Sequence, residues 1–140
     1  MASAPDAGTL TCMGMKVAVI NSNEDLIEVL RIVLTQAGLE TVVAHVPDIK
    51  RGREDLLSFV AQHEPAVIVY DIAPPYEENW NFLRLLQNLQ IMQGRRWVLT
   101  TTNKRALDAL VGDTGSFEIL GKPYDTDQVL TAVLKAISER

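Results

Sequence analysis

Three reactive side chains, Asp71, Thr101 and Lys122, each stand at or just beyond the end of an apolar run. If these runs are parallel strands, their carboxyl ends share one edge of a sheet, and we expect the three side chains to converge there. A carboxylate can attack phosphorus, while a hydroxyl and an ammonium hydrogen-bond and neutralise the transferred oxygens. The set therefore predicts covalent phosphorylation of Asp71.

The elements that position these residues follow from the apolar pattern. From Met15 onward, short runs rich in β-branched and aromatic residues alternate with segments of helical period, which is typical of an α/β protein with a parallel sheet. The near-continuous hydrophobicity of the runs predicts strands that are buried on both faces. The five predicted strands are residues 16–20, 41–44, 66–70, 97–100 and 117–120.

Five helices are predicted after these strands. The first has apolar residues at positions 26, 29, 30, 33, 34 and 37 and stops at Gly38, and the second covers about residues 53–63. The third would turn Phe82, Leu85, Leu86 and Leu89 inward, with Trp80 packing against the sheet. The fourth covers about 104–111 behind an Asn103 cap, and the fifth follows a capping box at Asp125 and Gln128. The polar stretch PDIKRGRED, residues 47–55, is predicted to be exposed, within a long connection at 46–54 of the kind that often serves partner recognition.

Size and composition limit the classes of function. A chain of 140 residues fits one domain, predicted at 15–140 behind a mobile tail at 1–14. No apolar run approaches the roughly 20 residues of a membrane span, so a cytoplasmic protein is expected. The net charge of −5 disfavours nucleic acid, because binding phosphate backbones needs clustered basic residues. A single cysteine, Cys12, cannot build a disulfide framework or a multi-cysteine metal site.

Three short motifs, YDIAPP, VLTT and GKPY, appear in this order, with Thr101 30 residues and Lys122 51 residues after Asp71. Through them, residues 15–140 resemble the response regulator receiver domain, a CheY-like family. The resemblance implies a flavodoxin-like, doubly wound sheet of five parallel strands in the order 2-1-3-4-5, with helices on both faces. It also implies two-component phosphorelay signalling rather than enzyme catalysis, with only slow self-dephosphorylation.

The resemblance assigns roles to individual residues. Asp71 would accept the phosphoryl group from a sensor histidine kinase or a phosphotransfer protein, and Lys122, before a cis peptide bond to Pro123, would pair with a phosphoryl oxygen. Thr101 would be the switch hydroxyl, and the backbone carbonyl of Ala73 would be a ligand for Mg²⁺. A downstream target or a second copy would bind the face made by the fourth helix, fifth strand and fifth helix.

The metal pocket departs from the family's pattern. Asn21 and Ser22 stand where receiver domains carry two acidic residues. Mg²⁺ prefers charged oxygens in an octahedral array, so one carboxylate in place of three predicts weak or absent binding. Glu24 could reach back toward Asp71, although acidic residues in a first turn are already explained by the helix dipole. Thr102 follows the predicted switch hydroxyl and would narrow access to Asp71.

Two other interpretations stay open. The first is a receiver that works without phosphorylation, as a protein–protein interaction module. The second is a flavodoxin-like cofactor binder, although residues 21–25 contain none of the glycines that let backbone amides approach a phosphate. Taken singly, the three reactive residues also have ordinary explanations, as a helix cap, a β-former and a solvated lysine.

Overall fold

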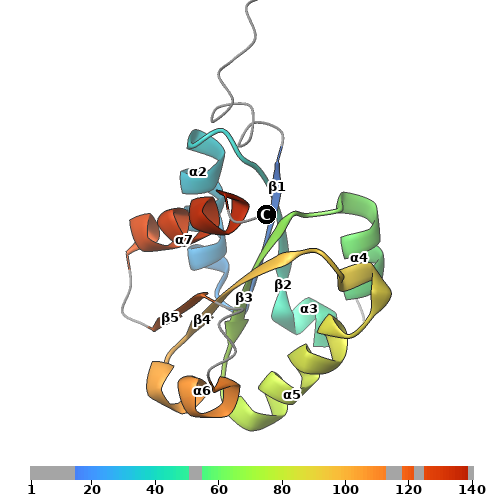
Figure 1. The fold of residues 1–140 in the computed structure, drawn as a ribbon. Helices are drawn as coiled ribbons and strands as arrows, with labels where there is room; N and C mark the ends of the chain where they lie inside the picture. Colours follow the sequence, from blue (N-terminus) through green and yellow to red (C-terminus); the bar gives the residue numbers. More distant parts are fainter. Residues whose placement is uncertain (1–14, 51–54, 113–117, 122–124, 139–140) are drawn as a thin grey trace, which may run out of the picture.

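The computed structural model describes residues 15–50, 55–112, 118–121 and 125–138. Five parallel strands form one sheet in the order β2-β1-β3-β4-β5, and helices cover both of its faces (Figure 1). The strands are β1 (Lys16–Asn21), β2 (Glu40–His45), β3 (Val67–Ile72), β4 (Arg96–Thr101) and β5 (Glu118–Gly121). The predicted fold class and strand order are confirmed. Phe117, the predicted start of the last strand, lies outside the described residues.

The described helices are α2 (Glu24–Gln36), α3 (Val46–Lys50), α4 (Leu56–His63), α5 (Tyr76–Gln87), α6 (Lys104–Val111) and α7 (Thr126–Ser138), with a 3₁₀ turn, η1, at Gln90–Met92. Helix α6 has the predicted bounds and the predicted cap, because Asn103 Oδ1 accepts a hydrogen bond of 3.0 Å from the amide of Ala106. At the start of α7, Gln128 Oε1 accepts a bond of 2.7 Å from the amide of Asp125, as in a capping box. None of the described helices has the length and apolar character needed to cross a membrane.

The sheet separates two apolar cores because successive strand residues point to opposite faces. In β3, Ile68 and Tyr70 pack with residues of α4, α5 and α6, whereas Val67 and Val69 pack with residues of α2 and α7. Both faces of the central strands are therefore covered, as their uninterrupted hydrophobicity predicts. The polar residues that end these strands lie at the carboxyl edge of the sheet, where the connections to the following helices begin.

The predicted inward face of α5 is wrong in three of its four residues. Leu86 is buried, but Phe82, Leu85 and Leu89 are 46%, 68% and 39% exposed, and the sheet is covered instead by Trp80, Leu83 and Leu86. Two rows of α5 have apolar residues at helical spacing, so periodicity does not decide which row turns inward. The row with Trp80 buries the larger side chain, and the prediction that Trp80 packs against the sheet is confirmed.

The segment after β2 also differs from its prediction as an exposed connection. Residues 46–50 form the short helix α3, whose Val46 and Ile49 lie on one side, three residues apart, and pack against the core shared by α4 and α5. Because α3 follows β2 directly, it lies beside the carboxyl edge of the sheet (Figure 1). In α2, Leu30 and Leu34 are buried as predicted, but Val29 and Ala37 are exposed and Ile27 is buried in their place.

Candidate functional site

Besides Thr101, three polar side chains are buried at the carboxyl ends of the central strands: Asn21 on β1, Asp71 on β3 and Thr100 on β4. Asp71 pairs with Thr100 where β3 runs beside β4. Ile20 of β1 pairs with Tyr70 of β3, so the next residue of β1, Asn21, lies beside Asp71. Each stands two residues after a valine that faces α2 and α7, and side chains two apart share a face of a strand. The three therefore lie on the same face of the sheet.

The hydroxyl that contacts Asp71 belongs to Thr100. Thr100 Oγ1 donates a hydrogen bond of 2.7 Å to Asp71 Oδ1, and both side chains are buried. Thr101, the predicted switch hydroxyl, is one residue further along β4 and points to the opposite face of the sheet. There its Oγ1 accepts a hydrogen bond of 3.3 Å from the amide of Asn103. The signal that would have identified Thr100 is its position two residues after Val98, because side chains two apart point to the same face of a strand.

The third predicted member of the set, Lys122, lies outside the described residues, and so does its peptide bond to Pro123. Its approach to Asp71 therefore stays a prediction. Gly121, the last described residue before it, ends β5 opposite Thr101, which leaves the chain at the same edge of the sheet as Asp71. The cis peptide bond found among the described residues joins Pro74 to Pro75 in the connection that follows β3.

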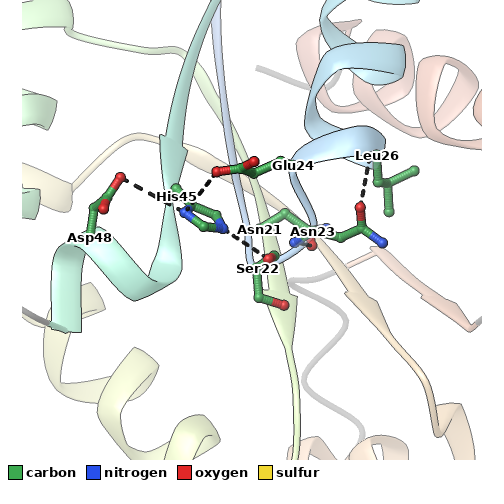
Figure 2. Close-up of polar contacts among 7 residues, drawn as sticks. All are labelled: Asn21, Ser22, Asn23, Glu24, Leu26, His45 and Asp48. Atoms are coloured by element: carbon green, nitrogen blue, oxygen red, sulfur yellow. Dashed lines mark hydrogen bonds and ion pairs between the residues drawn. The ribbon is translucent and has the colours of Figure 1, made fainter.

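The side-chain amides of Asn21 and Asn23 hold the connection between β1 and α2 (Figure 2). Asn21 Oδ1 accepts a bond of 2.9 Å from the amide of Asn23, and Asn23 Oδ1 caps α2 by accepting a bond of 3.1 Å from the amide of Leu26. The Ser22 side chain is exposed. The oxygen of Asn21 thus already shapes the turn, which reduces its capacity to bind a metal ion.

Glu24 is directed toward His45, as Figure 2 shows. Its Oε1 lies 3.7 Å from His45 Nδ1, and Asp48 Oδ2 of α3 lies 3.8 Å from the same nitrogen. His45 Nε2 lies 2.9 Å from the carbonyl oxygen of Ser22, and because a carbonyl oxygen only accepts, this nitrogen is the donor. The Glu24 carboxylate therefore faces His45, and the hydrogen bond from His45 to Ser22 ties β2 to the loop after β1.

The backbone carbonyl of Ala73, the predicted metal ligand two residues beyond Asp71, accepts a hydrogen bond of 2.6 Å from Asn79 Nδ2 of α5. Asn79 thereby fixes the chain that leaves β3. Ala73 and Asp71 also line a cavity of about 420 Å³ at this edge of the sheet. Its other lining residues come from the loop after β1, from α3, from β3 and from α5: Ser22, Val46, Ile49, Tyr70, Asn79 and Phe82.

Comparison with solved structures finds the same architecture in signalling proteins. A sensor protein from Polaromonas sp. JS666 matches with a TM-score of 0.71 and 16% identity over 90% of this chain and 98% of that one. A transiently phosphorylated "switch" in bacterial signal transduction matches with a TM-score of 0.68 and 27% identity over 89% and 95%. The chemotaxis response regulator CheY4 of Vibrio cholerae matches with a TM-score of 0.65 and 21% identity over 87% and 98%.

The chain has the receiver fold. No family model matches the sequence, and no curated protein matches it either. The structural likeness, together with the order of the strands, confirms the resemblance to CheY-like response regulator receiver domains that the three motifs indicate.

The metal pocket of this receiver fold does not present the donor set that Mg²⁺ prefers. Asp71 supplies a carboxylate, but Asn21 and the carbonyl of Ala73 already accept hydrogen bonds, and Glu24 faces His45. Within the described ranges, no three His, Cys, Asp or Glu side chains are grouped so that they could hold a metal ion. A small, hard cation that demands several charged oxygens would therefore be held weakly by these residues.

Two tyrosines flank the site of this receiver fold. Burial, and to a smaller extent the charge of neighbouring Asp71, raises the pKa of Tyr70 to about 12. Tyr76, at the start of α5, has its hydroxyl 2.7 Å from Thr102 Oγ1 in the turn after β4. This contact joins the connections that follow β3 and β4, so Thr102 contributes a tie between two loops at the edge of the site. That tie was not anticipated from the sequence.

Proposed function

We propose that this chain is a response regulator receiver domain of a two-component pathway that accepts a phosphoryl group on Asp71 in a weakened, Mg²⁺-dependent phosphotransfer. The observation that carries the proposal is the buried Asp71 at the carboxyl end of the central strand, with the Thr100 hydroxyl 2.7 Å from its Oδ1. The likeness to a transiently phosphorylated switch of bacterial signal transduction supports it.

In the proposed reaction, a carboxylate oxygen of Asp71 forms a bond to phosphorus. The bond from phosphorus to the donor, a histidine nitrogen of a sensor kinase or of a phosphotransfer protein, breaks and leaves its electron pair on that nitrogen. The product is an acyl phosphate on Asp71. Thr100, which replaces Thr101 in this proposal, would then donate its hydrogen bond to a phosphoryl oxygen, and Lys122 would neutralise charge on the same group.

A divalent cation would take part in the proposed reaction, but it would be weakly bound. A divalent cation would offset the charge of the phosphoryl oxygens as they meet the carboxylate. Because the described donors hold one carboxylate in place of a cluster, we expect the cation to bind weakly and the reaction to be slow. Only slow self-dephosphorylation is proposed, and catalysis of another reaction is not.

The experiment is incubation with acetyl phosphate and Mg²⁺, followed by intact-mass measurement. The wild-type chain should gain one phosphoryl mass slowly, and Ser22→Asp, which restores an acidic residue beside Asp71, should gain it faster. Asp71→Asn is the control and should gain none. The proposal fails if neither the wild-type chain nor Ser22→Asp gains mass, or if the gain persists in Asp71→Asn.

A second candidate function is a receiver that binds its partners without phosphorylation. It is favoured by the single carboxylate of the pocket, by the hydrogen bond that Asn21 makes within the loop after β1, and by the direction of Glu24 toward His45. In that case Asp71→Asn would leave partner binding and cellular output unchanged, whereas a phosphoacceptor would lose its regulated output. The face of α6, β5 and α7 is the predicted surface for a target or a second copy under either function.

A further inference from the structure

Helix α5 carries an apolar row on the side that faces away from the sheet. Phe82 and Leu85 are 46% and 68% exposed and lie about 60° apart around α5 at 100° per residue, and Leu89, two residues beyond the end of α5 at Gln87, is 39% exposed. Glu78, one turn before Phe82, falls within the same arc. We call these four residues the α5 stripe.

The α5 stripe differs from the other exposed apolar residues of the described chain. Single apolar side chains on a surface are ordinary, but a contiguous row on one helix marks a contact surface. The remaining large exposed side chains are spread over α2, β2 and α4, and none of those whose side chains the structure describes lies on α6 or α7. The surface expected from the family's usual contacts is thus less apolar than α5 in the part that the structure describes.

One end of the α5 stripe borders the cavity beside Asp71. Phe82 forms a wall of that cavity together with Val46 and Ile49 of α3. A volume of about 420 Å³ exceeds the space that one large apolar side chain needs, and binding surfaces gain most of their affinity from such an anchor in a pocket. Helix α3 therefore adds a pocket that can seat an anchoring residue at the edge of the row.

The charged side chains that the structure describes beside the α5 stripe are acidic. Glu77 and Glu78 are exposed at the start of α5, and α3 carries Asp48 beside Val46 and Ile49. The single basic residue of α5, Arg84, points about 160° away from Phe82 around the helix. A complementary surface would thus combine apolar residues with a basic end, which also agrees with the net charge of −5.

We propose that the α5 stripe is a docking surface for an amphipathic helix of a partner protein. The partner helix has apolar residues three and four apart and basic side chains at the end that meets Glu78. One apolar residue enters the pocket between Phe82, Val46 and Ile49, and the next two pack on Leu85 and Leu89, as in helix-in-groove recognition. This inference goes beyond the proposed function because the contact does not require phosphorylation of Asp71.

The test uses fluorescence anisotropy with a labelled, helix-stapled peptide that has leucines at positions i, i+3 and i+7 and two lysines at one end. Leu85→Ser should weaken binding about tenfold, since it removes the centre of the row. The matched control is Leu57→Ser, which changes an equally apolar side chain that is 39% exposed on α4, and should bind like wild type. Far-ultraviolet circular dichroism checks that both variants fold.

Reversing the charge of Glu78 tests the direction in which the partner helix lies on the α5 stripe. Glu78→Lys should weaken binding of the lysine peptide and strengthen binding of a peptide with glutamates in place of the two lysines. The inference is overturned if the wild-type chain does not bind the peptide, if a peptide with scattered leucines binds equally well, or if Leu57→Ser weakens binding as much as Leu85→Ser. It is also overturned if Leu85→Ser abolishes a dimer of this chain without changing peptide binding, because the occupant would then be a second copy.

Discussion

Replacement of Thr100 by valine tests which hydroxyl serves the site. Valine has the shape of threonine without the hydroxyl, so Thr100→Val removes the 2.7 Å hydrogen bond to Asp71 Oδ1 and leaves the packing of β4 nearly intact. Thr101→Val is the matched control. It removes a hydroxyl that accepts a 3.3 Å bond from the amide of Asn103 and does not share a face with Asp71.

The expected magnitudes follow from the two contacts. A hydrogen bond to a charged group contributes about 1.5–3 kcal/mol, and a bond between neutral groups contributes about 0.5–1.5 kcal/mol. Thr100 and Asp71 are both buried, so water does not replace the lost donor and the full penalty applies. We expect Thr100→Val to lower the free energy of unfolding by about 1.5–3 kcal/mol, and Thr101→Val to lower it by about 0.5–1.5 kcal/mol.

A double-mutant cycle separates the hydrogen bond from other effects of each change. Urea unfolding of Thr100→Val, Asp71→Ala and the double variant should give a coupling energy of about 1–3 kcal/mol, whereas Thr101→Val with Asp71→Ala should couple by less than about 0.5 kcal/mol. Strong coupling of Asp71 to Thr101, together with none to Thr100, would refute the assignment. It would mean that Thr101, not Thr100, points to the face of the sheet that carries Asp71, so that side chains no longer alternate between the two faces at the end of β4.

Two further predictions test the core around the site. Because the pKa of Tyr70 is raised from its ordinary 10 to about 12 in the folded chain, its contribution to stability is complete below pH 10 and is lost as the pH rises toward 12. The loss amounts to about 2–3 kcal/mol, is measured by urea unfolding across this range, and should be absent in Tyr70→Phe. In α5, Trp80→Ala should lower the free energy of unfolding by about 3–5 kcal/mol, and Phe82→Ala by less than about 1 kcal/mol. The reverse order in the same unfolding assay would mean that Phe82, not Trp80, faces the sheet.

Much of the fold is determined locally by the sequence. The strands are apolar on both faces and rich in β-branched residues, so their existence and their parallel pairing follow from the pattern alone. Helices α6 and α7 are predictable because each has one apolar face and a side chain that caps its first turn, Asn103 for α6 and Gln128 for α7. Asp71 stands out in the sequence because it ends an otherwise apolar strand.

Other features required the tertiary structure, because the local pattern allows more than one answer. Helix α5 is apolar on two sides, and only packing against the sheet decides that Trp80 is buried and Leu85 is exposed. Thr100 and Thr101 are both good β-formers at the end of a strand, and only the pairing of β4 with β3 decides which hydroxyl meets Asp71. From its place in the chain, Glu24 could have faced Asp71 or His45. His45 lies close to it only because β2 pairs with β1. The sequence thus determines which residue types reach the edge of the sheet, and the long-range pairing of strands decides which of them touch.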